Sequence, residues 1–133
     1  MGKVVHFEIP TDDLERAKAF YGSIFGWQLQ TMNMGEEDYT IAMTGPVDEK
    51  TQRPTEPGSI NGGMTQRGGS IPAPIITIEV DAIDDSLKQI EAGGGGVVQA
   101  RTEIPDMGAF AYFTDSEGNV MGLWETAPGS LER

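Results

Sequence analysis

Residues 4–26, VVHFEIPTDDLERAKAFYGSIFG, carry the pattern that decides the fold. Val5, Phe7 and Ile9 alternate with more polar neighbours, and a period of two is typical of a strand with one buried face. Apolar residues then recur at helical spacing and predict an amphipathic helix. Its expected buried stripe consists of Leu14, Ala17, Phe20, Tyr21 and Ile24.

Both ends of this helix carry sequence signals. Asp12 and Glu15 have the spacing of a capping box, which predicts that the helix begins here. Gly26 follows the last apolar residue, where glycine readily adopts a left-handed cap. Residues 4–26 are therefore expected to form a strand followed by a helix.

The rest of the chain repeats this pattern. After the helix we expect a strand at 27–34, a turn at 35–38 and a strand at 39–43. A long exposed loop at 44–58, a strand at 59–65 and a linker at 66–74 follow. The second half predicts a strand at 75–80, a helix at 81–92 and strands at 97–102, 109–114 and 120–125. The order is βαβββ twice, which predicts an α+β fold whose two halves can close around a cavity.

Composition narrows the function classes. The 133 residues fit a single domain, 1–133, with modules at 1–65 and 74–127. There is no cysteine, which excludes disulfides, thiolate metal sites and a cysteine nucleophile. The net charge of −12 disfavours nucleic acid and anionic membranes as partners, and it suits a cationic ligand or simply solubility. No signal-like or membrane-spanning apolar run is visible, so we expect a cytoplasmic protein.

Two stretches resemble a known family. The run from His6 to Tyr21, followed by Phe25-Gly26-Trp27, is similar to the opening βα unit of the glyoxalase/bleomycin-resistance/dioxygenase (vicinal oxygen chelate) superfamily. Residues 113–119, FTDSEGN, resemble the hairpin before that family's last strand, with Ser116 where proline is usual. The resemblance implies two βαβββ modules with curled mixed β-sheets around a ligand cavity, and it specifies the fold better than the activity.

The resemblance also implies a metal site in some members, with one ligand from each of four strands. The corresponding positions here are His6, the segment 61–64, Ile75 or Thr77, and Gly122. His6 alone is a metal-binding residue type, and Asn61 is a poor ligand for a transition metal. We therefore expect no family-type metal site and no cofactor.

Strand periodicity predicts which side chains line the cavity. His6 and Glu8 share one face and are the candidate catalytic residues, because a histidine beside a carboxylate can act as a general base. Thr77, Glu79, Trp124 and Asn61 are candidate ligand-binding residues. The alternative is a polar lining without catalysis. Trp27, Tyr39, Phe110 and Tyr112 could add aromatic walls, or could be ordinary core.

Two functions remain open. The first is metal-free binding and sequestration of a small molecule, cationic or aromatic, in the manner of bleomycin-resistance proteins. The alternative is a glyoxalase-like lyase or dioxygenase with a displaced metal site built from His6, Glu8 and Glu79. In either case we expect a homodimer, because natural sheet edges are usually covered.

Overall fold

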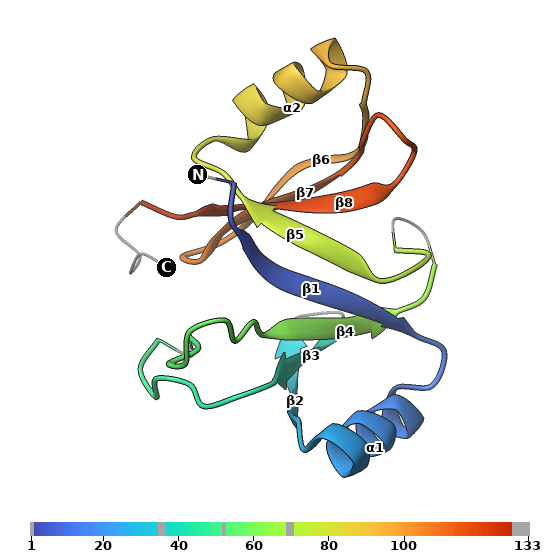
Figure 1. Cartoon of the computed structure of the whole chain (residues 1–133), viewed down its shortest axis with the longest axis vertical. Coiled ribbons are helices and arrows are strands. Elements are labelled where there is room, and N and C mark those ends of the chain that lie inside the picture. Colours follow the sequence, from blue (N-terminus) through green and yellow to red (C-terminus); the bar gives the residue numbers. More distant parts are fainter. Residues whose placement is uncertain (1, 35–36, 52, 69–70, 129–133) are drawn as a thin grey trace. The chain divides into compact units, whose positions relative to one another are not determined.

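The computed structural model describes residues 2–34, 37–51, 53–68 and 71–128. In chain order the elements are β1 (Val4–Thr11), α1 (Leu14–Phe25), β2 (Gln28–Met34), β3 (Glu37–Met43), β4 (Gly62–Gln66), β5 (Ile75–Glu79), α2 (Ile83–Ala92), β6 (Gly96–Ile104), β7 (Gly108–Thr114) and β8 (Val120–Thr126) (Figure 1). The predicted α+β fold with the order βαβββ twice is confirmed. Part of the predicted turn at 35–38 and of the linker at 66–74 lies outside the described residues.

The chain divides into two compact units. The first unit is His6–Pro74, and the second contains Met1–Val5 and Ile75–Arg133. That the two units form one domain around a cavity stays a prediction. Within the described residues, neither helix is long and apolar enough to cross a membrane.

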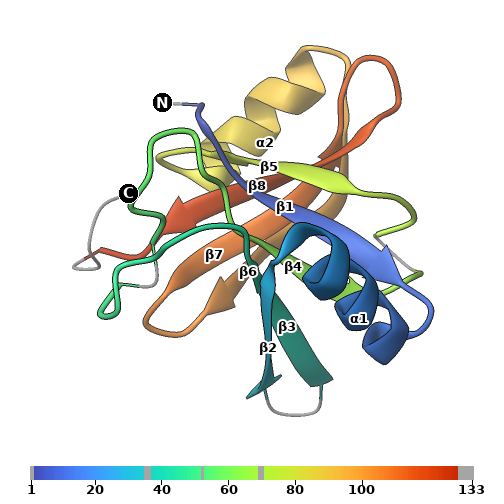
Figure 2. The ribbon, with the colours of Figure 1, turned by 60° about the horizontal axis from the view of Figure 1, so that its bottom comes forward.

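In the first unit the strands follow the order β2-β3-β4-β1. β1 runs parallel to β4, with Phe7 opposite Gly62 and Glu8 opposite Gly63, and the other neighbours are antiparallel. Helix α1 contacts β2 and β4 on one face of this sheet (Figure 2). Thr40, Ala42 and Met64 are almost completely buried in this unit.

The second unit repeats this arrangement with the order β5-β8-β7-β6. β5 runs parallel to β8, with Thr77 opposite Gly122. Helix α2 contacts β6, β7 and β8 and covers a core of buried apolar residues. The core contains Ile83, Leu87, Ala109, Ala111, Phe113 and Leu123, with Ile78 and Val80 packed against it. The backbone of Glu79 also hydrogen-bonds to Gly2 and Lys3 at the chain's start.

The structure corrects the predicted start of α1. Its N-cap is Asp13, one residue later than expected, because the Asp13 carboxylate accepts a hydrogen bond from the backbone N–H of Arg16. Asp12 instead forms an ion pair with Arg67, at 2.9 Å. The C-cap at Gly26, with φ of 72°, agrees with the prediction.

The expected buried stripe of α1 is only partly formed. Leu14, Ala17 and Tyr21 are half-buried, but Phe20 is 52% exposed and Ile24 is 59% exposed. No residue of α1 is fully buried in the structure. The periodicity correctly predicted the helix. It could not show how much of the apolar side of the helix would be buried against the sheet.

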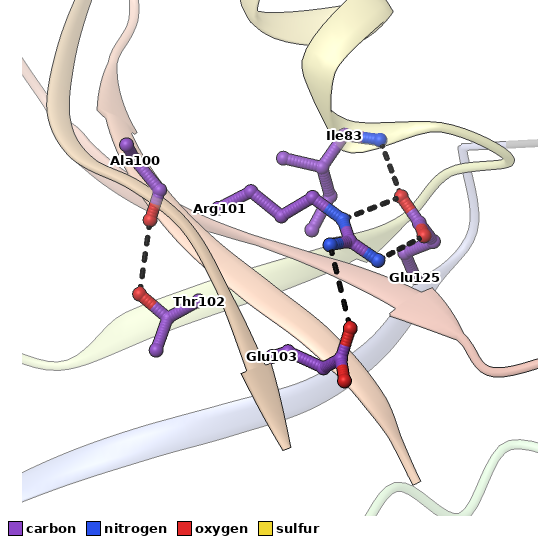
Figure 3. A network of polar contacts seen from close by, with 6 residues as sticks. All are labelled: Ile83, Ala100, Arg101, Thr102, Glu103 and Glu125. Carbon is purple, nitrogen blue, oxygen red and sulfur yellow. Dashed lines mark hydrogen bonds and ion pairs between the residues drawn. The ribbon is translucent and has the colours of Figure 1, made fainter. Parts of the chain in front are cut away.

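Helix α2 begins without a side-chain cap of its own, because its N-cap residue is Ala82. The Glu125 carboxylate, on β8, accepts a hydrogen bond of 2.8 Å from the Ile83 backbone N–H (Figure 3). Arg101 donates to both oxygens of the same carboxylate and also lies near Glu103. The hydrogen bonds from Arg101 lower the pKa of Glu125, although the partial burial of the Glu125 carboxylate opposes this shift.

Candidate functional site

The two faces of the first-unit sheet carry different side chains. Phe7 lies over Gly62 and contacts the Trp27 ring, which stacks on Tyr21 of α1. This face is therefore the helix side, and Trp27 belongs to it and not to a polar site. His6 and Glu8 alternate with Phe7 and point to the opposite side. We call that opposite side the open face; its polar members include His6, Glu8, Tyr39 and Thr65.

Tyr39 joins the two candidate catalytic residues. Its hydroxyl lies 3.1 Å from His6 Nε2, which is hydrogen-bonding distance. Burial raises the pKa of Tyr39, and the nearby negative charge of Glu8 raises it further. Glu8 is only 9% exposed. Tyr39 is therefore a protonated phenol at neutral pH, able to donate a hydrogen bond to His6 or to a ligand.

The Tyr39 hydroxyl also covers Gly63. A Cβ atom at position 63 would overlap with the phenol oxygen and ring, so any larger side chain there would displace Tyr39. Position 63 lies opposite Glu8 in the segment where the family resemblance implies a metal ligand. In this chain, the space for such a ligand is filled by the Tyr39 hydroxyl.

Thr65 lies two residues beyond Gly63, so its side chain is on the same face of β4. Its hydroxyl oxygen is inaccessible to solvent and has no hydrogen-bond partner among the described residues. Its backbone carbonyl accepts a hydrogen bond from the Thr11 hydroxyl at 3.3 Å. A buried, unsatisfied hydroxyl is uncommon in folded proteins.

A second polar cluster lies in the other unit. The Trp124 indole N–H donates to the Thr126 hydroxyl at 3.1 Å, and that hydroxyl donates to Glu79 Oε2 at 3.2 Å. Thr77 is buried and its hydroxyl oxygen would lie 2.7 Å from a Cβ atom at Gly122. The structure thus brings together the predicted residues Glu79 and Trp124.

Phe110 and Tyr112 belong to the same face as this second cluster. They pair with Trp124 and Gly122 of β8, and their ring centroids are 5.8 Å apart. These two aromatic residues therefore do line the polar face of their sheet. Asn61, by contrast, uses its side-chain oxygen to accept a hydrogen bond from the Thr44 backbone N–H, at the start of the long loop.

The donor set does not fit the family metal. Position 63 is a glycine covered by Tyr39, and Gly122 is closely approached by the Thr77 hydroxyl. His6 Nε2 already contacts Tyr39. No group of three or more histidine, aspartate or glutamate side chains is gathered for a metal among the residues that the structure describes. We therefore derive no chemistry that depends on a metal.

Two surface hollows lie elsewhere. One, of about 390 Å³, is lined by residues of the second unit that include Arg101, Glu103 and Asp106. The other, of about 280 Å³, lies beside the start of α1 and includes Arg16 and Arg67. Neither is lined by the candidate residues of the two polar clusters.

Sequence reasoning missed two polar residues of these faces. It did not single out Thr65 or Thr126, because a threonine in a strand gives no signal of its own. It considered Tyr39 only as an aromatic wall or an ordinary core residue. The periodicity of β3 and β4, once their register is known, identifies Tyr39 and Thr65 as members of the His6 face.

Comparisons with known proteins identify relatives over nearly the whole chain. A family model described as bleomycin resistance protein-like N-terminal matches residues 3–45. A glyoxylase-like domain-containing protein of Didymella fabae is 31% identical over 133 residues, covering 96% of both chains. A Mycobacterium tuberculosis protein named "Putative glyoxylase CFP32" is 29% identical over 120 residues, which are 89% of this chain but 43% of that protein. The chain therefore spans less than half the length of the mycobacterial relative.

Solved structures with the same fold are more distant in sequence. Methylmalonyl-CoA epimerase of Streptomyces coelicolor, in complex with 2-nitronate-propionyl-CoA, superimposes with a TM-score of 0.67. The superposition covers 99% of each chain at 16% identity. At this identity the similarity supports the fold and leaves the activity open.

Proposed function

The chain belongs to the glyoxalase/bleomycin-resistance (vicinal oxygen chelate) family, and we propose that it binds a small molecule on the open face without the family's metal ion. The observation that carries the proposal is the position of Tyr39. Its hydroxyl covers Gly63 and contacts His6, so a phenol stands where the resemblance implies metal ligands. A protonated phenol binds a ligand by hydrogen bonding and does not require a bound ion.

We propose a cationic ligand, because the charges of the open face favour one. Glu8 is a buried carboxylate, and its field already acts on Tyr39. A ligand that brings a positive group beside Glu8 is stabilised electrostatically, because solvent only weakly screens the attraction between that group and the buried carboxylate. The net charge of −12 would also raise the local concentration of cations.

The residues of the second cluster are proposed as ligand-binding residues of their own unit. Thr77, Glu79 and Trp124 present a hydroxyl, a carboxylate and an indole from one face of their own sheet. They can hold polar and aromatic groups of a ligand. In this reading His6 and Glu8 orient the ligand, and general-base catalysis by either residue is not required.

The test is the metal content of protein purified without a histidine tag. We expect only trace transition metal by elemental analysis, unchanged in the His6→Ala variant. About one metal ion per chain, lost in His6→Ala, would overturn the proposal and favour the metal-dependent lyase or dioxygenase. A thermal-shift screen of small cations then seeks the ligand, because binding raises the melting temperature by mass action. Glu8→Gln should abolish the shift, whereas Glu91→Gln, at an exposed carboxylate on α2, should not.

The homodimer expected from the sequence is also part of the proposal. The exposed apolar residues of α1, which include Phe20, Ile24 and Phe25, support it, because exposed apolar patches often mark interfaces. Light scattering should give a mass of about twice 14.3 kDa. A 14.3 kDa particle at high protein concentration would contradict the dimer and leave the binding proposal unaffected.

A further inference from the structure

Strand β2 is the outer strand of the first-unit sheet. It pairs with β3 in a continuous register over all 7 of its residues, without a bulge (Figure 2). Among the described residues, no backbone hydrogen bond links it to any segment other than β3. The side of β2 that faces away from β3 therefore carries unpaired N–H and C=O groups, which can serve as a template for another strand.

Natural proteins usually protect such an edge, and the second unit of this chain does so. Its outer strand β6 has two register shifts against β7, and it carries the charged residues Arg101 and Glu103. Irregularities and charges of this kind discourage pairing between molecules. The sequence of β2, QLQTMNM, contains no charged residue and no proline. The two units therefore end in edges of different kinds, one protected and one suited to pairing.

A second copy of β2 is complementary to this edge. In an antiparallel pair centred on Thr31, the two Thr31 residues face each other, and Gln30 of each copy lies opposite Met32 of the other. All three residues are exposed, so they are accessible to a second copy. Two strands of this length would form about six to eight main-chain hydrogen bonds, which is within the usual number for a protein interface.

Charge favours the antiparallel direction. β3 begins with Glu37 and Asp38, which pair with the last residues of β2. A parallel pair would bring these acidic residues of both copies to the same end, whereas an antiparallel pair keeps them at opposite ends. Near the centre of β2, Lys18 donates a hydrogen bond to Thr31 and is itself paired with Glu15 at 3.6 Å. The middle of the strand therefore presents no unbalanced charge to a second copy.

We propose that β2 is the dimer contact of this chain, and that it pairs antiparallel with β2 of a second copy about a twofold axis at Thr31. This inference rests on the homodimer of the proposed function and names its interface. The axis is perpendicular to the joined sheet, so the open faces of both copies lie on one side and both α1 helices on the other. Gln30 of one copy then extends the open face of the other beside Met32, which lies opposite Tyr39.

The chain has no cysteine, so single introduced cysteines report the contact without interference. Residues that face each other in an antiparallel pair have Cα atoms about 4.5 to 5.5 Å apart, which a disulfide can bridge. Thr31→Cys should therefore form a disulfide-linked dimer under mild oxidation, detected on a non-reducing gel. Gln28→Cys is the matched control. Its two copies would lie about 20 Å apart along the strands, so it should not cross-link.

Thr31 also bonds to Lys18 and Thr40, so a second measurement leaves Thr31 unchanged. The double variant Gln30→Lys/Met32→Lys places like charges opposite each other and should weaken the dimer about tenfold in sedimentation experiments. Gln30→Lys/Met32→Glu places opposite charges there and should stay within about threefold of wild type. The first variant also reduces the net charge of −12, so general charge repulsion alone would give the reverse order.

Each other outcome decides the question. A dimer that survives Gln30→Lys/Met32→Lys but is lost in Ile24→Ser would overturn β2 as the contact and keep the homodimer, formed through α1. Equal cross-linking of Thr31→Cys and Gln28→Cys would mean random collision, and no cross-linking of Thr31→Cys would mean that the strands do not meet; either result overturns the inference. A monomeric wild type would overturn both the inference and the homodimer, and would leave the edge to an extended segment of another protein. The metal content tests the binding proposal separately.

Discussion

Helices α1 and α2 occupy corresponding places in the two βαβββ units, but they are attached to their sheets differently. Helix α2 buries Ile83 and Leu87 in an apolar core. Helix α1 fully buries no residue; Tyr21 stacks on Trp27, just before β2, and Lys18 donates a hydrogen bond to Thr31 of β2. Two similar patterns in one chain therefore produce one well-covered helix and one largely exposed helix.

The two helices also begin differently. Asp13 caps α1 from the adjacent position in the sequence, so this cap forms locally. The cap of α2 comes from Glu125, which lies on β8, the last strand in the chain. The start of α2 therefore depends on the completed tertiary structure, whereas the start of α1 does not.

The largest expected difference concerns core packing. Leu87→Ala should lower the free energy of unfolding by about 2 to 4 kcal/mol, because it leaves a cavity among Ile83, Phe113 and Leu123. Chemical denaturation monitored by circular dichroism measures the change. A loss below about 1 kcal/mol would mean that α2 is no better packed than α1.

The next effect concerns the cap of α2. Glu125→Ala should cost about 1 to 2 kcal/mol, because the Ile83 N–H and the Arg101 guanidinium both lose their acceptor. Hydrogen exchange should show faster opening of the first turn of α2, with α1 unaffected. Equal acceleration in both helices would contradict a cap specific to α2.

The same carboxylate predicts a pH dependence. The pKa of folded Glu125 is lowered by Arg101, so its stabilisation is fully present above the unfolded carboxyl pKa of about 4.3. It is lost as the pH falls through the lower pKa of the folded state. The difference in melting temperature between wild type and Glu125→Gln should therefore be largest near pH 7 and shrink as the pH falls below about 4.3. A difference that grows on acidification would show the opposite sign of coupling.

A smaller effect is expected for the local cap of α1. Asp13→Ala should cost about 0.5 to 1 kcal/mol, and Asp13→Asn should be close to neutral because asparagine is an equally good N-cap. Thermal denaturation of the two variants, side by side, measures this. Asp12→Ala is the control, and it should remove only an exposed ion pair with Arg67.

The smallest effect on folding is expected on the outer side of α1. Ile24→Ser should change stability by less than about 0.5 kcal/mol, because Ile24 is 59% exposed. If the exposed residues of α1 form the dimer interface, the same variant should weaken the dimer in sedimentation experiments. A large loss of stability in a monomeric protein would show that α1 is covered within its own chain.

The candidate site was only partly predictable from the sequence. A period of two placed His6 and Glu8 on one face, and the structure agrees. Neither Tyr39 nor Thr65 could be joined to them, because strands β3 and β4 come 30 to 60 residues later and their register depends on pairing. Asn61 was placed in the site by its position, but its side-chain oxygen is used by Thr44.

The sequence by itself determined the order of the elements and the faces of the strands, because periodicity and capping act over a few residues. It also placed a metal-binding residue type at only one of the four ligand positions that the resemblance implies, which is His6. Only the tertiary structure decided that Tyr39 covers Gly63, that the Thr65 hydroxyl has no partner among the described residues and that Glu125 caps a helix 42 residues away. These contacts join segments distant in the chain, and their formation depends on which side chains compete for the same space.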